Sequence, residues 1–282
     1  MTVAEEAEKY GLHRVGARPS LVNYLKQTWG RRTFIYELAK SRVQSQNQRN
    51  RLGIIWVVLK PTFNALMYGF IFGILQGGNK PQDFPIFVVI GVFLFEFFSS
   101  SMTGGARSIT GNTALVQSLA FPRLALPVGK VTENLLTLMP MIGVMFIYAL
   151  ILGTTPKWSW FVIFPLIALF TIFNMGTALI CARITVHIRD FTQLLPLVTR
   201  ILFYTSGVLF SVDKLLDKWP WMIRVFDFHP IYQTLTIARG SIMNNESYDP
   251  TAWLVVGGWA VIALIAGLLY FWKAEERYGR ES

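Results

Sequence analysis

Residues 84–106 read Phe-Pro-Ile-Phe-Val-Val-Ile-Gly-Val-Phe-Leu-Phe-Glu-Phe-Phe-Ser-Ser-Ser-Met-Thr-Gly-Gly-Ala, and Glu96 is the only charged residue among them. A helix needs about 20 mostly apolar residues to cross the hydrocarbon core of a bilayer, so this run predicts a membrane span. Five similar runs surround it. We therefore predict an all-α polytopic membrane protein with six transmembrane helices at about residues 54–75, 84–106, 124–152, 158–182, 191–211 and 252–272.

The composition agrees with a membrane protein rather than with a soluble enzyme. Of the 282 residues, 53% are hydrophobic and only 15% are charged, whereas about a quarter of the residues of a typical soluble domain are charged. The single cysteine, Cys181, excludes a disulfide framework, and the three scattered histidines argue against a histidine metal centre.

The positions of the 26 Lys and Arg residues predict the orientation. With six spans both termini lie on one side, and if that side is the cytoplasm, the inner segments hold 17 basic residues and the outer segments six. Because Lys and Arg favour cytoplasmic loops, we predict cytoplasmic termini. The net charge of +10 is then a sign of topology, and we expect no nucleic-acid partner. We also expect no cleaved signal peptide, because residues 1–53 are polar and lack a short apolar core.

Two segments outside the spans have amphipathic patterns. In the cytoplasmic segment 1–53, apolar residues between Leu21 and Leu38 alternate with basic ones, which is typical of an interfacial helix that binds anionic headgroups. The alternative is a helix packed on a soluble partner. The outer segment 212–249 is too apolar for a solvated loop and too interrupted to span, so we predict a re-entrant helical hairpin with a helix starting at Pro230. Residues 273–282 form a cytoplasmic tail.

The sequence lacks the motifs of catalysis. It has no Gly-x-x-x-x-Gly-Lys-Ser/Thr loop, so the chain should not hydrolyse ATP by itself. It also lacks a His-Glu-x-x-His motif, a Gly-x-Ser-x-Gly motif and the paired aspartates of many sugar-nucleotide transferases. We therefore predict no catalytic residue, no metal site and no cofactor bound by this chain.

Besides Lys60, four charged residues lie within predicted spans, namely Glu96, Lys130, Glu133 and Arg200. Each costs on the order of 2.5–3.5 kcal/mol at membrane depth, so such residues usually face a partner or a cavity. They either form ion pairs between helices or line a polar conduit. Lys130 and Glu133 are three residues apart and should share one helical face.

The first predicted span carries an unusual stripe. Its members recur at spacings of three and four, and are Trp56, Lys60, Phe63, Met67, Phe70 and Ile74. Aromatic rings stack on sugar rings, and Lys60 near the inner end could meet a phosphate. The alternative is a helix–helix seam in which Lys60 extends to the headgroups. On the opposite side, Gly69 and Gly73 form a small-x-x-x-small pattern that favours close packing of helices.

The order of several short motifs resembles a known family. Leu52-Gly53-Ile-Ile-Trp56-Val-Val-Leu59-Lys-Pro61 opens the first span, Phe121-Pro122-Arg123 follows the second, and Arg189-Asp190 precedes the fifth. Over about residues 20–275 the chain resembles the membrane subunit of ABC-2 type exporters, in the branch that exports O-antigen, capsule, teichoic acid and cell-wall galactan. It departs from that pattern at Ser206-Gly207-Val208, where Ser-Pro-Val is common, and at His229-Pro230, where Asn-Pro is common.

The resemblance implies a homodimer in the bacterial inner (plasma) membrane, bound to two copies of a separate ATPase that holds ATP and Mg. A coupling helix at about residues 107–123 would dock on the ATPase. The implied coupling residues are Arg107, Phe121, Pro122, Arg123, Arg189 and Asp190. A lipid-linked polysaccharide would pass along the first and fifth spans. The implied conduit residues are Trp56, Lys60, Phe63, Phe70, Phe203 and Tyr204.

Two other functions remain open at this point. The first is an ABC-2 exporter of drugs or lipids, whose pore needs fewer aromatic rings along its length. The second is a membrane-embedded enzyme that acts on a lipid carrier, with Glu96 or His229 as its acid or base.

Overall fold

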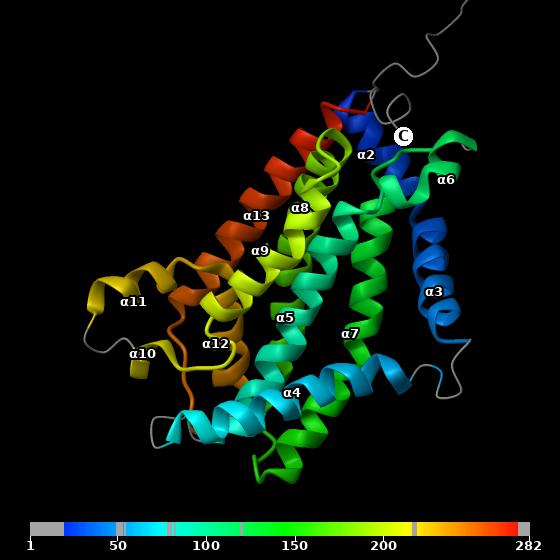
Figure 1. Ribbon diagram of the computed structural model, residues 1–282. Coiled ribbons are helices and arrows are strands. Elements are labelled where there is room, and N and C mark those ends of the chain that lie inside the picture. Colours follow the sequence, from blue (N-terminus) through cyan, green and yellow to red (C-terminus); the bar gives the residue numbers. More distant parts are fainter. Residues whose placement is uncertain are drawn as a thin grey trace, which may run out of the picture.

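The computed structural model describes residues 20–48, 53, 55–77, 81, 83–118, 121–215 and 219–275. In these ranges the chain is helical and has no β-strand (Figure 1), which confirms the all-α prediction. The predicted cytoplasmic ends before residue 20 and after residue 275 lie outside the described residues. So do Leu52 of the Leu-Gly pair and residues 119–120 of the predicted coupling helix.

Five helices in the described part of the chain are long and apolar enough to cross a membrane. They are α4 (Ile55–Leu75), α5 (Phe84–Ala106), α7 (Ala125–Ile151), α8 (Ile163–His187, preceded by the 3-10 helix η3, Trp158–Val162) and α13 (Thr251–Trp272). Each matches one of the predicted spans, with boundaries that differ by at most five residues. The sequence therefore predicted these five elements correctly.

The remaining predicted span, residues 191–211, is shorter in the structure. Its helix α9 covers Phe191–Thr205, and 15 residues extend about 22 Å, less than the roughly 30 Å of a hydrocarbon core. The chain turns after Ser206, and Gly207 adopts a φ of 66° that favours glycine. The helix thus ends six residues before the predicted boundary.

Helix α5 forms the centre of the bundle, because α4, α7, α8 and α12 (Pro230–Ile242) all pack against it. Its phenylalanines interlock with those of α8: Phe98 stacks on Phe170 and Phe173 with ring centroids 6.4 and 6.0 Å apart. By contrast, α4 is the least buried of the five long helices, and Figure 1 shows it crossing the bundle obliquely at one edge. Helix α4 therefore packs on α5 but leaves most of its own surface uncovered.

Helices α8 and α13 approach each other closely and share the most extensive interface among the described helices. A Cβ atom at Gly176 would overlap the backbone of Ala263, and one at Gly267 would lie 2.5 Å from the carbonyl oxygen of Gly176. Small residues are common at such interfaces, since helices in lipid associate by close packing rather than by the hydrophobic effect. In the predicted small-residue pattern of α4, a Cβ built at Gly73 would lie 3.6 Å from the Phe84 ring, whereas nothing lies within 4 Å of one built at Gly69.

The predicted N-terminal amphipathic helix is present as two helices, α2 (Leu21–Gly30) and α3 (Arg32–Gln48). Ser20 caps the first, because its hydroxyl accepts the backbone N–H of Asn23. Helix α3 packs along α7. In Figure 1, α2 lies at the same end of the molecule as the C-terminal end of α13.

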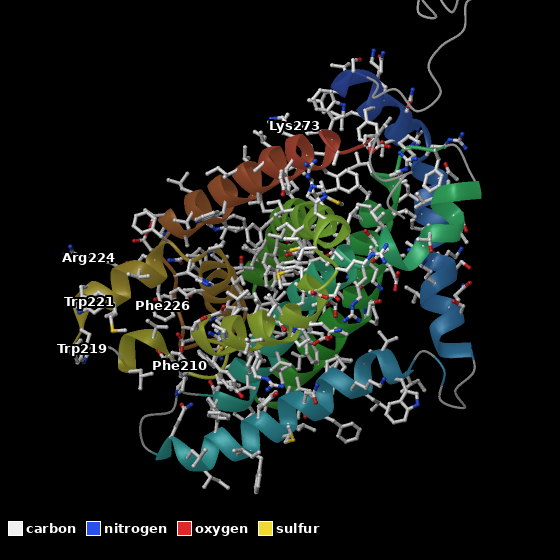
Figure 2. All side chains as sticks on the ribbon, turned by 45° about the horizontal axis from the view of Figure 1, so that its top comes forward. Phe210, Trp219, Trp221, Arg224, Phe226 and Lys273 are labelled. Atoms are coloured by element: carbon white, nitrogen blue, oxygen red, sulfur yellow. The ribbon has the colours of Figure 1, made fainter. Side chains whose placement is uncertain are left out.

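The described residues of the segment predicted as a re-entrant hairpin form three helices, α10 (Val212–Leu215), α11 (Pro220–Asp227) and α12. Helix α12 begins at Pro230 as predicted and is buried against α5, α8 and α13. Figure 2 shows Trp219, Trp221, Arg224 and Phe226 grouped on the part of the chain that projects from the bundle. The predicted coupling helix contains the 3-10 turn η2 (Thr110–Asn112) and the short α6 (Thr113–Ser118).

Candidate functional site

A polar cavity of about 530 Å³ lies where α4, α5 and α7 meet. It brings together six of the residues that the sequence singled out: Trp56, Lys60, Glu96, Arg107, Lys130 and Glu133. The other lining residues are Val43, Val57, Pro61, Asn64, Phe97, Ser100, Thr103, Gly104, Asn134, Thr137, Leu138 and Met141. Ionisable residues from three separate helices thus face one cavity.

The charges of the cavity differ in how they are compensated. Lys130 Nζ lies 2.6 Å from Glu133 Oε1, and Glu133 is buried. This pair joins two turns of α7 and not two helices, so the expected shared face is confirmed. Glu96 is exposed to the cavity and its carboxylate accepts a hydrogen bond from Ser100 at 2.9 Å. The cavity therefore holds a neutralised pair beside exposed charges from Lys60, Arg107 and Glu96.

Gly104 shapes the cavity, a role that the sequence interpretation missed. A Cβ built on it would lie 2.5 Å from Lys130 Cε, so the lysine stem packs directly on the backbone of α5. The neighbouring Gly105 makes the corresponding close contact with Ala178 of α8. The adjacent Gly104-Gly105 pair in an apolar run is the sequence feature that could have predicted both contacts.

A second cavity of about 440 Å³ shares Gly104, Arg107, Lys130 and Glu133 with the first. Its remaining lining residues are Arg42, Ser45, Ser108 and Asn112. Arg42 Nη2 donates to Asn112 Oδ1 at 2.6 Å, and Asn112 Nδ2 donates to the Ser108 carbonyl at 2.7 Å. Helix α3 is thereby tied to the segment predicted to couple to an ATPase.

Some of the predicted conduit residues line the cavity and others lie outside it. Trp56 and Lys60 line the cavity, whereas Phe63 and Phe70 are 58% and 71% exposed farther along α4. Phe203 of α9 contacts Tyr68 and Phe95, with ring centroids 5.2 and 5.1 Å away.

The remaining predicted residues of α9 lie outside the cavity. Tyr204 is 48% exposed and packs edge-on against Phe203. Arg200 is also exposed, and no ion pair involving it is found in the described residues. The structure therefore brings only Trp56 and Lys60 of the six conduit candidates into the cavity.

The predicted coupling residues lie at separate places. Phe121 packs edge-on against Phe34 of α3 at 6.0 Å, and Pro122 is buried. Arg189 and Asp190 are exposed in the turn between α8 and α9. Arg107 is exposed and lines both cavities.

Arg123 belongs to a buried cluster that joins three distant parts of the chain. Its Nη1 donates to the Glu275 carbonyl at 2.8 Å and lies 3.6 Å from Glu275 Oε1. The Tyr24 hydroxyl of α2 donates to Glu275 Oε2 at 2.5 Å and accepts the backbone N–H of Leu124 at 3.0 Å. Burial raises the pKa of Glu275 above its usual range, although the hydrogen bond from Tyr24 and the charge of Arg123 act in the opposite direction.

The residues named for an enzyme do not meet. Glu96 lines the cavity, but His229 does not, and its Nδ1 caps α12 by accepting the backbone N–H of Tyr232 at 3.2 Å. Among the described residues, no group of three or more His, Cys, Asp or Glu side chains is placed to hold a metal ion. The structure therefore does not bring together the two residues of the enzyme alternative, Glu96 and His229.

Comparison with known proteins places this architecture in a family. A family model described as "ABC-2 type transporter" matches residues 33–243, which include all helices from α4 to α12. The O-antigen export system permease protein RfbA of Klebsiella pneumoniae is 28% identical over 229 residues, 80% of this chain and 86% of that protein. The protein of the same name from Myxococcus xanthus is 23% identical over 259 residues, 92% and 98% of the two chains. The polysialic acid transport protein KpsM of Escherichia coli is 22% identical over 233 residues, 80% and 87%. The chain therefore belongs to the ABC-2 type transporter family.

Proposed function

We propose that this chain is the membrane subunit of an ATP-driven exporter of a lipid-linked polysaccharide, of the O-antigen, capsule, teichoic acid or cell-wall galactan type. The observation that carries the proposal is its similarity, over at least 80% of its length, to permease proteins named for O-antigen export and polysialic acid transport. The polymer would leave the cytoplasm across the inner membrane of a bacterium.

The assembly would be a homodimer bound to two copies of a separate ATPase, and α9 with residues 206–211 would complete six spans. The exposed apolar faces of α4 and α9 support a dimer, since Phe63, Phe70 and Ile201 have no internal partner that covers them. Both termini would be cytoplasmic, as the basic residues of the inner segments favour. The ATPase would supply the hydrolysis for which this chain has no motif.

The cavity would receive the cytoplasmic end of the substrate. Trp56 offers a ring for stacking on sugars, and Lys60 and Arg107 offer cationic groups for a phosphate. Stacking tolerates different sugars, so a long polymer could slide without being held at deep sites. The neutral Lys130–Glu133 pair would add polar lining without a strong net charge.

Depletion of the protein in its host tests the proposal. Finished lipid-linked polymer should then accumulate on the cytoplasmic face of the inner membrane. Its amount is measured in lipid extracts, and its sidedness by labelling of sealed inside-out vesicles. A polymer that stays short, or is never made, would instead indicate an enzyme acting on the lipid carrier. Trp56→Ala with Phe63→Ala should strongly reduce polymer export, whereas a drug exporter would keep most of its transport.

A further inference from the structure

A groove of about 740 Å³ lies between α2, α3, α7, α8 and α13, away from the charged cavity. Its floor is apolar and comes from the long helices: Leu124, Val128, Met175, Leu264 and Leu268. The rest of its lining comes from α2 and α3, with Thr132 of α7 at the far end. Leu25, Lys26, Trp29, Arg32 and Tyr36 are exposed and form the rim, whereas Thr28 and Ile35 are buried. No acidic residue lines it.

We propose that this groove binds an anionic phospholipid of the bilayer, with one acyl chain on the apolar floor and the headgroup held by Lys26 and Arg32. From Leu124 to Thr132 the groove follows eight residues of α7, or roughly 12 Å. That length fits within one leaflet, which is about half of a 30 Å hydrocarbon core. The groove therefore matches the depth to which an acyl chain of one leaflet extends.

The rim has the properties of a headgroup site. Lys26 and Arg32 are exposed, and the Arg32 guanidinium lies 5.7 Å from the centroid of the Trp29 ring. Trp29 is 72% exposed, and tryptophan is enriched at the boundary between hydrocarbon and headgroups. Two basic residues near an anionic surface favour a negative over a neutral lipid by roughly 30-fold. The charge of the rim thus selects an anionic lipid.

The occupant is a bilayer phospholipid rather than the lipid carrier of the exported polymer. None of the conduit candidates lines the groove. Helix α7 contributes Lys130 and Glu133 to the charged cavity and different residues, Val128 and Thr132, to the groove. The lipid site therefore does not depend on what is exported, and its test is separate from that of the proposed function.

Native mass spectrometry of the purified full chain, after delipidation and addition of defined lipids, tests the site. The wild-type protein should retain phosphatidylglycerol roughly 30-fold better than phosphatidylcholine. The double variant Lys26→Gln/Arg32→Gln should retain the two lipids about equally. The matched control Lys40→Gln changes an exposed lysine of α3 that does not line the groove, and it should keep the wild-type preference.

A second variant tests the floor. Val128→Trp fills the groove and should reduce retention of both lipids while the protein still elutes as a single species from a sizing column. Equal retention of both lipids by the wild-type chain would overturn the proposal, as would an unchanged preference in the double variant. Displacement of phosphatidylglycerol by an equimolar polyprenyl diphosphate would overturn the choice of occupant and assign the groove to the carrier.

Discussion

Removing the Glu275 carboxylate should loosen the contact between the N-terminal helix, the Phe-Pro-Arg turn and the end of the last span. Glu275→Ala deletes the hydrogen bond from the buried Tyr24 hydroxyl at 2.5 Å and the ion pair with Arg123 at 3.6 Å. A hydrogen bond to a charged group contributes about 1.5–3 kcal/mol. The Arg123 side chain is 22% exposed and can recover water, so its contribution is smaller. We expect the free energy of unfolding to fall by about 2–3 kcal/mol.

This loss is measurable as a shift in thermal stability. One kcal/mol corresponds to roughly 2–4 °C in a domain of this size, so the Tm of Glu275→Ala in detergent should drop by about 4–12 °C. Glu275→Gln keeps an acceptor for Tyr24 and should lose less than about half of that. Glu37→Ala, which removes an exposed carboxylate on α3, is the control and should change Tm by about 1 °C or less.

The pH dependence of the Tm difference between the wild-type protein and Glu275→Gln shows whether the pKa of Glu275 is raised or lowered. Because burial raises the pKa of Glu275, the pH-linked part of its stabilisation is present at low pH and is lost as pH rises through the raised pKa, whereas the contacts of the ionised carboxylate with Tyr24 and Arg123 remain above it. Glutamine does not titrate, so the Tm of the wild-type protein minus that of Glu275→Gln should decrease as pH rises from the ordinary carboxyl range. The opposite slope would refute the reasoning, since it would mean that Arg123 and Tyr24 outweigh burial. An unchanged Tm in Glu275→Ala would refute the cluster itself.

The remaining predictions concern the helix seam, coupling and the cavity. Gly176→Ala should separate α8 from α13 and lower Tm by more than about 5 °C. Gly69→Ala, with open space around it, should leave Tm nearly unchanged. Equal effects of the two substitutions would contradict the close packing of α8 on α13. Arg123→Ala, assayed below its own Tm, should leave ATP hydrolysis by the partner active while export falls, and normal export would remove Arg123 from a coupling role. Lys60→Gln should slow export of a phosphate-linked substrate by about tenfold with Lys60→Arg near wild type, and equal rates for both variants would exclude a role of the charge.

The sequence predicts the long helices well because their cause is local. A segment such as 84–106 must form all its backbone hydrogen bonds within itself when it lies in lipid, so it becomes a helix. Its length and apolar composition are therefore enough to identify it. The end of α9 was missed because Val208, Leu209 and Phe210 keep the segment hydrophobic, although Gly207, which adopts a positive φ just after the helix, is a residue that often follows a helix end. Hydropathy measures which solvent a segment prefers, and it is insensitive to a break in a segment that stays apolar.

Contacts between distant residues set the limits of the site prediction. The sequence identified Lys60, Glu96, Lys130 and Glu133 one at a time by their cost in a span, and the structure gathers them in one cavity. It could not link Tyr24 to Glu275, because 251 residues separate them and neither belongs to a motif. Polar residues in apolar surroundings are conspicuous individually, whereas their pairing depends on how the helices pack.

Arg239 of α12 stabilises the chain where α9 ends earlier than predicted. The sequence pattern predicts Arg239 to be an outer basic residue, but it is buried in α12 and donates to the carbonyls of Gly207 and Val208 at 2.9 and 2.8 Å. It also reaches the Phe87 carbonyl at the start of α5, and its guanidinium lies over the Phe87 ring. A backbone that leaves its helix at membrane depth must satisfy its carbonyls within the protein. Arg239 does so for the carbonyls of Gly207 and Val208, directly after the end of α9. Arg239 is therefore a buried residue that stabilises the turn after α9, and not a solvated loop charge as the sequence prediction assumed.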